Sequence, residues 1–268
     1  MSDVDVYSRF KAAQRERWAQ FAAVATITTP PAARLVRHAG VRAGARVLDV
    51  ACGTGVVAVT AARLGARVTG LDLTPELLAV ARDNARIAAV EIDFHEGDVE
   101  ALPFERDAFD IVVSQYGHIF APRPETAVAE MLRVLKSGGT IAFSTWPPQF
   151  YIGRLFTLVA RYTPPAELKA PSPALWGDPN IVRERLGSAV RDVVFDSDTL
   201  LVPALSPQHS RELTERTSGQ VMKVEELLGE HDPARLATFR QELEQLAADF
   251  FIDNAVRQSY LLTRATKI

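Results

Sequence analysis

Short apolar segments alternate with helix-forming segments over the first half of the chain, and this alternation is the feature that most constrains the fold. The expected strands are 45–51, 66–73, 91–98, 109–115 and 140–146. Segments with a helical spacing of apolar residues stand between most of them, at 55–65, 74–88 and 123–139. Strands that alternate with helices form parallel sheets with helices on both faces. The sequence therefore predicts an α/β fold with a doubly wound, Rossmann-like sheet.

The second half of the chain contains fewer expected strands and more expected helices. We expect a helix at 150–165, a sixth strand at 189–197, two or three helices within 206–252 and a closing strand at 257–267. Near the N-terminus, aromatic residues recur at roughly helical spacing among charged ones, which predicts an amphipathic helix with Tyr7, Phe10, Trp18 and Phe21.

The bulk composition excludes several classes of protein. Of the 268 residues, 47% are apolar and 24% are charged, which is ordinary for a globular protein with a sizeable core. The net charge of −3 gives no general attraction to nucleic acid, and no apolar run reaches the length of a membrane span. The single cysteine, Cys52, excludes an internal disulfide. We expect a cytoplasmic protein with no nucleic-acid or membrane partner.

The first expected strand ends in a glycine turn, "VLDVACGTG" at 47–55. Through Ala58 the turn reads G-T-G-V-V-A, one form of the motif that holds a dinucleotide pyrophosphate. The next strand ends in Asp72, nineteen positions after Gly53, where a carboxylate can bind ribose hydroxyls. These two features suit NAD and S-adenosylmethionine equally.

Two further acidic residues distinguish between these cofactors. Asp49 precedes Gly53 by four residues, and its carboxylate suits the ammonium and sulfonium groups of S-adenosylmethionine but would repel a pyrophosphate. Asp98 follows the third strand, where its carboxylate can accept a hydrogen bond from the adenine amino group, while the Val99 N–H serves a ring nitrogen. The glycine turn and the three acidic residues Asp49, Asp72 and Asp98 together favour S-adenosylmethionine over NAD.

Five ordered segments resemble one known family. These are "VLDVACGTG", "GLDLTPELL", "GDVEALPF", "FDIVVSQYG" and "EMLRVLKSGGTIAFSTW". Together they resemble the class I S-adenosylmethionine-dependent methyltransferases, in the branch similar to the ubiquinone/menaquinone-type enzymes, and they cover about residues 40–146. The resemblance implies a seven-stranded sheet, mostly parallel with its last strand antiparallel, and helical lid elements.

The resemblance also implies which residues contact the cofactor. Asp49 and the 53–55 turn would face the methionine part, Asp72 the ribose, and Asp98 the adenine, while residues around 114–116 would line the methionine side. The predicted cofactor-binding set is Asp49, Ala51, Gly53, Gly55, Asp72, Leu73, Asp98, Val99, Ser114 and Gln115. We expect one domain over 1–268, with a helical lid at 1–30, a cofactor-binding core at 40–146, and substrate-side helices and closing strands at 147–268.

Methyl transfer is an in-line displacement, so the protein must align the reactants, exclude water and remove a proton if the nucleophile carries one. A base should lie beyond the fourth or fifth strand, and the candidates are His118 and then Tyr116. Each could instead be a wall residue of an apolar pocket. The remaining histidines are dispersed without the spacing of metal ligands, so we predict no metal.

We therefore predict an S-adenosylmethionine-dependent methyltransferase that acts on a small-molecule acceptor. One alternative is an NAD(P)-dependent oxidoreductase, which would share the glycine turn and Asp72. Another is a module that binds S-adenosylmethionine without catalysis. The N-P-P-[YF] element of base-methylating enzymes is absent, because the fourth strand ends in "SQYG". The sequence specifies neither the acceptor nor the oligomeric state.

Overall fold

The computed structural model describes residues 3–164, 168 and 170–268, with side chains for all of these except 3–5, 20, 23 and 24. Its α-helices are α1 (Asp3–Trp18), α2 (Thr29–His38), α3 (Val56–Arg63), α4 (Pro75–Ile87), α5 (Pro124–Val134), α6 (Tyr151–Tyr162), α7 (Pro179–Leu186), α8 (Pro207–Thr217), α9 (Gly219–Leu228) and α10 (Pro233–Phe250). The 3₁₀ helices are η1 (Ala19–Thr28), η2 (His118–Phe120), η3 (Pro173–Gly177) and η4 (Gly187–Ala189). The strands are β1 (Arg46–Val50), β2 (Arg67–Asp72), β3 (Ile92–Glu96), β4 (Phe109–Gln115), β5 (Leu135–Thr145), β6 (Val190–Pro203), β7 (Phe251–Ile252) and β8 (Ala255–Lys267).

The sheet has the strand order β3-β2-β1-β4-β5-β8-β6. Strands β1 to β5 pair in parallel, whereas β8 runs antiparallel to both β5 and β6. This topology confirms the predicted fold class, a doubly wound Rossmann-like sheet whose final long strand is antiparallel. The two-residue β7 pairs with the start of β8 and is an addition to the predicted strands.

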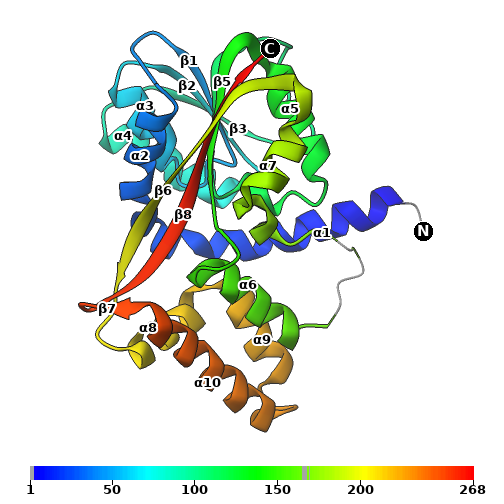
Figure 1. Cartoon of the computed structure of the whole chain (residues 1–268), viewed down its shortest axis with the longest axis vertical. Helices are drawn as coiled ribbons and strands as arrows, with labels where there is room; N and C mark the ends of the chain where they lie inside the picture. The colour runs from blue at the N-terminus through cyan, green and yellow to red at the C-terminus, as the bar shows by residue number, and fades with distance from the viewer. Residues whose placement is uncertain (1–2, 165–167, 169) are drawn as a thin grey trace.

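Helices cover both faces of this sheet, with α2, α3 and α4 on one face and α5 and α7 on the other (Figure 1). The central strand β1 therefore carries apolar residues on both faces, and Val47, Leu48 and Val50 are all fully buried. The strand order reverses between β1 and β4, and in such sheets ligands bind beyond the carboxyl ends of the strands at this point.

Two expected boundaries differ by five residues or more in the structure. Helix α5 ends at Val134 rather than at the predicted residue 139, because Leu135 already pairs with Phe109 of β4 and residues 135–139 begin strand β5. Strand β6 continues to Pro203, beyond the predicted residue 197, because it pairs with β8 along this whole length. Residue 165, the last of the expected helix at 150–165, lies outside the described residues.

Helices α6, α8, α9 and α10 form a separate group, here called the helical lobe. Three of them are inserted between β6 and β8, and Figure 1 shows the lobe beyond the end of these two long strands. The lobe has its own buried apolar cluster, which includes Leu155, Leu158, Val221, Val224, Phe239 and Leu243. The sequence pattern indicates no such second core, because its contacts come from helices far apart in the chain.

Helix α1 lies between the sheet and the helical lobe (Figure 1). None of its described side chains is buried. The predicted N-terminal helix exists, but Phe21 lies in η1 and α1 has no buried apolar face, so its predicted amphipathic character is not confirmed. The helix covers the edge of the sheet without inserting into the core. Among the described residues, no helix combines the length and the apolar character that a membrane span requires.

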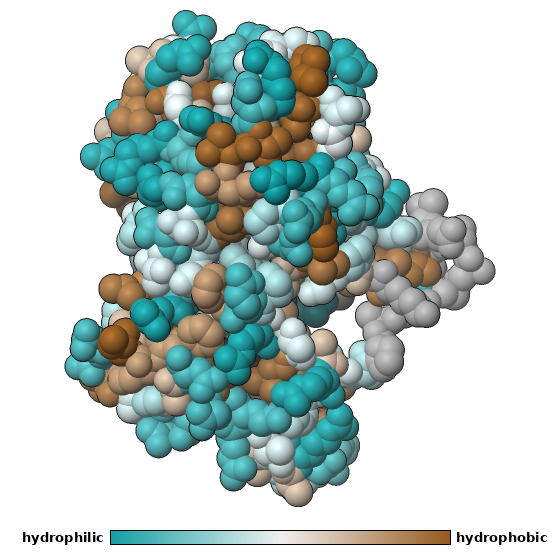
Figure 2. All heavy atoms as spheres, viewed as in Figure 1, coloured by the Kyte–Doolittle hydropathy of each residue, from teal (hydrophilic) through white to brown (hydrophobic). Residues whose placement is uncertain are grey.

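Most of the face seen in Figure 2 mixes hydrophilic and hydrophobic residues, with apolar atoms also present near the turn that carries β7. Large exposed apolar side chains at this turn are Leu201, Leu205 and Ile252. They lie where β6 and β8 extend past the rest of the sheet.

Candidate active site

The glycine turn after β1 is tightly folded and held to the neighbouring strand. The Cys52 N–H donates to the Leu71 carbonyl (3.0 Å), and the Gly55 N–H donates to the Cys52 carbonyl (2.9 Å). Three residues of the turn have left-handed backbone conformations: Ala51 (φ 53°), Gly53 (φ 55°) and Gly55 (φ 77°). A Cβ at Gly55 would lie 3.1 Å from that of Ala81, so glycine also permits α3 to begin close to α4. Strain of this kind at Ala51 is common at ligand-binding turns.

Asp49 lies at the base of this turn and is almost completely buried. Its Oδ2 accepts a hydrogen bond from the Ala58 N–H of α3 (2.9 Å), whereas its Oδ1 has no partner among the described residues. Burial raises the pKa of Asp49 to about 8, opposed in part by the Ala58 N–H and reinforced by the charge of Asp72. A buried acceptor oxygen without a donor indicates a missing cationic or hydrogen-bond-donating partner.

Gln115, at the end of β4, provides a second oxygen of the same kind. Its Nε2 donates to the Thr28 carbonyl (2.8 Å), which fixes the amide, and its buried Oε1 has no partner among the described residues. In the pairing of β1 with β4, Asp49 is opposite Val113, so Gln115 lies two residues further along on the same face. The residues present therefore fit the ammonium end of S-adenosylmethionine, which has several N–H donors.

Asp72, at the end of β2, connects the glycine turn to helix α4. Its Oδ2 accepts from the Gly53 N–H (2.7 Å) and its Oδ1 from the Thr74 N–H (2.8 Å). Burial raises the pKa of Asp72, and the two N–H groups oppose this shift. Thr74 is the N-cap residue of α4, and its side chain makes no capping hydrogen bond within the described chain; its N–H is the one that donates to Asp72. Each carboxylate oxygen retains a lone pair for a ribose hydroxyl, and Leu73 follows directly in the chain.

Asp98 and Val99 lie beyond β3, in the loop where adenine binding is expected. The Asp98 Oδ1 accepts from the Glu100 N–H (2.9 Å), and its Oδ2 accepts from Lys11 of α1 (2.5 Å). The Asp98 side chain stays 26% exposed, so it is not enclosed by the protein. Lys11 and Glu100 belong to this arrangement although sequence reasoning missed both. Glu100 stands in the quoted "GDVEALPF" segment, but nothing in the sequence links it to Lys11.

The two turns that follow β1 and β4 pack directly against each other. Ser114 Oγ donates to the Val50 carbonyl (2.7 Å), and a Cβ on Gly117 would lie only 2.5 Å from that of Ala51. Tyr116 has φ 62°, and its ring stacks on Trp146 with the centroids 4.0 Å apart. The Tyr116 hydroxyl is buried and has no partner among the described residues, and burial raises its pKa well above the ordinary value.

His118 has different surroundings from Tyr116. It is fully buried, with its ring centroid 4.7 Å from Phe143 and 4.7 Å from Trp176. Neither ring nitrogen has a partner within the described chain, and burial, with a smaller effect of Arg185, lowers its pKa to about 3. Phe143 and Ser144 alternate along β5, so His118 lies on the face opposite to Gln115, which pairs with Ser144. The structure thus does not bring the two candidate bases together, and the surroundings of His118 favour a wall position.

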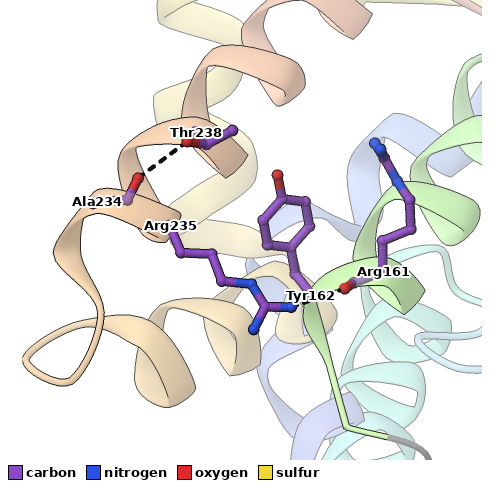
Figure 3. A pocket seen from close by; sticks show the side chains of 5 residues that line it. All are labelled: Arg161, Tyr162, Ala234, Arg235 and Thr238. Atoms are coloured by element: carbon purple, nitrogen blue, oxygen red, sulfur yellow. Dashed lines mark hydrogen bonds between the residues drawn. The ribbon is translucent and has the colours of Figure 1, made fainter.

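Other surface and thiol features lie outside this arrangement. A hollow between α6 and α10 is lined by Arg161, Tyr162, Ala234, Arg235 and Thr238 (Figure 3). Glu242 accepts from both Arg161 (3.0 Å) and the Tyr162 hydroxyl (2.7 Å), so part of the positive charge is already balanced. Burial raises the pKa of the Cys52 thiol, which is thus a neutral packing group in the turn. No group of three potential metal ligands occurs within the described residues, and the absence of a metal stays a prediction.

Comparisons with known proteins agree with this geometry. The profile of the methyltransferase domain family matches residues 48–143. Two Mycobacterium tuberculosis proteins of uncharacterised function are 34% and 33% identical to the chain, covering 94% and 96% of it and 93% and 94% of their own lengths. A ubiquinone biosynthesis O-methyltransferase of Xanthomonas oryzae is 42% identical over 104 residues, which are 38% of this chain and 44% of that enzyme. The chain belongs to the class I S-adenosylmethionine-dependent methyltransferases.

Solved structures share the fold of this methyltransferase. A Bacillus halodurans protein matches with a TM-score of 0.58 and 22% identity, over 88% of this chain and 98% of that one. The phosphoethanolamine N-methyltransferase 2 of Haemonchus contortus, in complex with S-adenosylhomocysteine, matches with a TM-score of 0.55 and 17% identity, over 89% of this chain and 52% of that one. The [4+2]-cyclase SpnF matches with a TM-score of 0.52 and 18% identity, over 90% of this chain and 81% of that one. Family membership excludes the oxidoreductase alternative, and S-adenosylmethionine is the cofactor.

Proposed function

We propose that this methyltransferase transfers a methyl group to a small-molecule acceptor by in-line displacement. The observation that carries the proposal is a pair of buried oxygens at the carboxyl ends of β1 and β4, Asp49 Oδ1 and Gln115 Oε1, which accept no hydrogen bond from the residues the structure describes. When bound, S-adenosylmethionine supplies an activated methyl group whose leaving thioether is neutral. The protein then has to bind and align the two reactants and to exclude water from the site.

Along the edge of the sheet, different residues would bind different parts of the cofactor. Asp49 and Gln115 would accept hydrogen bonds from the ammonium group, and the 51–55 turn would hold the methionine part. Asp72 would accept from the ribose hydroxyls with the lone pairs that Gly53 and Thr74 leave free. Asp98, in the loop after β3, would accept from the adenine amino group. The order along the sheet, β4-β1-β2-β3, follows the order of the groups in the cofactor.

The acceptor would lie beyond β4 and β5, next to Tyr116 and Trp146. Both rings are buried against each other, so this wall excludes water. With its raised pKa, the Tyr116 hydroxyl is a hydrogen-bond donor at neutral pH, and we assign it the role of orienting the acceptor. Helix α1 and the helical lobe lie on this side of the sheet (Figure 1), which supports an acceptor of limited size. The cytoplasmic location and the lack of a nucleic-acid partner stay predictions from composition.

The first experiment is calorimetric binding of S-adenosylhomocysteine to the wild type and to Asp72→Asn. We expect at least about a tenfold loss of affinity, since each hydrogen bond to a charged group contributes about 1.5–3 kcal/mol. Asp83→Asn, on the exposed side of α4, is the matched control and should bind as the wild type does. Binding to NAD instead of S-adenosylhomocysteine would overturn the proposal.

The second experiment tests turnover. Release of S-adenosylhomocysteine from S-adenosylmethionine is measured over a panel of small phenols, amines and thiols, with tRNA and duplex DNA as competing substrates. We expect turnover with at least one small molecule and none with the nucleic acids. Turnover with nucleic acid alone would refute the acceptor class, and binding without any turnover would favour the non-catalytic module.

A further inference from the structure

Helix α1 is joined to the loop after β3 by a lysine that contacts two carboxylates. Lys11 Nζ lies 2.5 Å from Asp98 Oδ2 and 2.5 Å from Glu100 Oε2. The Lys11 side chain is only 15% exposed, whereas the ion pair formed one turn later by Arg15 and Glu96 (2.8 Å) is exposed at both partners. Lys11 is therefore the most enclosed charged contact described between α1 and this loop.

Glu100 links this contact to the loop after β4. Its side chain is fully buried, and it accepts hydrogen bonds from the Arg123 N–H (2.6 Å), Nε (2.9 Å) and Nη2 (2.8 Å) as well as from Lys11. The Arg123 guanidinium in turn lies 4.8 Å from the ring centroid of Tyr7 in α1. A buried carboxylate needs opposite charge and hydrogen bonds to offset its desolvation. Lys11 and Arg123 supply both, so the position of Lys11 is fixed by a buried group.

Asp98 receives its orientation from the same arrangement. Its Oδ1 accepts from the Glu100 N–H and its Oδ2 accepts from Lys11, so both oxygens are held from the protein side. Each oxygen keeps a further lone pair, and the partly exposed side chain leaves room for one more donor. A carboxylate held in this way presents a free lone pair in a fixed direction.

We propose that Lys11 is a positioning residue for adenine recognition: it fixes the Asp98 carboxylate toward the adenine 6-amino group and holds α1 over the adenosine half of the cofactor. This inference rests on the proposed function, because it takes Asp98 as the adenine-binding residue. Lys11 does not touch the reacting atoms and acts through Asp98. Without Lys11, the Asp98 carboxylate would be held by the Glu100 N–H alone, and Glu100 would keep Arg123 but lose the Lys11 contact.

The test compares two ligands that differ only at the adenine 6-position. S-adenosylhomocysteine carries the amino donor there, and its purine-riboside analogue carries only hydrogen and keeps the ring nitrogen N1 as an acceptor. Calorimetric affinities for both are measured on the wild type, Lys11→Met, Lys11→Arg and Arg15→Met. The wild type should prefer the adenosyl ligand, and Lys11→Met should lose about tenfold of this preference, the effect of one charge-assisted hydrogen bond. Lys11→Arg should retain most of it, and Arg15→Met, the matched control on the same helix, should retain all of it.

Every outcome separates this inference from the proposed function. A wild type that binds neither ligand contradicts the proposed function itself. A wild type that binds S-adenosylhomocysteine, together with an unchanged preference in Lys11→Met, overturns the role of Lys11 alone. An equal loss for both ligands assigns Lys11 to anchoring α1 and not to adenine, and tighter binding of S-adenosylhomocysteine shows that Lys11 competes with adenine. If thermal melts show that Lys11→Met does not fold, Lys11→Gln is measured by the same criteria.

Discussion

At the scale of single residues, the buried carboxyl of Asp49 destabilises the folded, ligand-free protein when it ionises. Its pKa is about 8 in the folded chain against an ordinary value of 3.8, so the folded state holds a proton that the unfolded state releases between these values. Stability contributed by the protonated form is therefore complete below about pH 3.8 and is lost as the pH rises toward 8. Asn imitates the protonated carboxyl, keeps an acceptor for the Ala58 N–H and carries no charge.

We expect Asp49→Asn to stabilise the ligand-free protein by several kcal/mol more at pH 8 than near pH 5, since the ionised form of the wild type costs about 1.4 kcal/mol for each pH unit between its two pKa values. The same substitution should weaken the binding of S-adenosylmethionine, since the ligand's ammonium group loses its counter-charge. Thermal melts at both pH values, with Asp83→Asn as control, check the first part and calorimetry checks the second. Equal Tm changes at the two pH values would contradict the pKa assignment.

His118 is the second residue whose role depends on its surroundings. Its pKa of about 3 lies below the ordinary 6.5, because burial disfavours the charged imidazole. The unfolded chain binds a proton below pH 6.5 and the folded chain does not, so this stabilisation is complete above pH 6.5 and decreases as the pH falls toward 3. A ring that stays neutral under acid conditions and is closed to solvent is a poor general base.

The corresponding experiment is NMR of protein labelled in its histidine rings. We expect the His118 ring to stay neutral at pH 5. His118→Leu identifies the signal. A His118 midpoint above pH 6 would restore the catalytic base predicted from the sequence.

At the scale of elements, the packing of two turns decides the shape of the site. Gly117 follows β4, and a Cβ there would lie 2.5 Å from the Ala51 Cβ and 2.8 Å from the Ala51 carbonyl oxygen. We expect Gly117→Ala to push the turns apart, to destabilise the protein by about 1–3 kcal/mol and to weaken S-adenosylhomocysteine. Gly219→Ala, where the new methyl meets only ordinary contacts at Arg17, is the matched control. Chemical denaturation and calorimetry measure the two effects, and a Gly117→Ala protein as stable as the control would refute the close approach.

At the scale of the whole molecule, the helical lobe has a core of its own but shares β6 and β8 with the sheet. The predicted single domain requires that both parts unfold together. Phe239 is fully buried in the lobe, and Phe239→Ala should cost about 3–5 kcal/mol. We expect one shifted transition, coincident by far-UV circular dichroism and by loss of S-adenosylhomocysteine binding. Two separate transitions, with ligand binding preserved through the first, would show that the lobe is an independent domain.

The sequence by itself determined the order of strands and helices over residues 45–146, because the relevant signals are local. Strands and helices alternate with clear periodicity from 45 to 146, and the acids at 49, 72 and 98 each stand directly at or after a strand end. In a parallel sheet the carboxyl ends of the strands share one edge, so chain order alone brings such residues together. The seven-strand path with its antiparallel last strand is implied by the family resemblance and is confirmed by the structure.

Only the tertiary structure decided what depends on contacts between distant segments. The end of α5 is set by the pairing of Leu135 with Phe109, which overrides the helical periodicity up to residue 139. The different surroundings of Tyr116 and His118, two residues apart, come from opposite faces of the sheet. The link from Lys11 to Asp98 joins residues 87 positions apart, and a lysine on a polar helix gives no local sign of it. Burial and pairing are properties of the folded chain, and they decide which of these polar groups are charged, held or free.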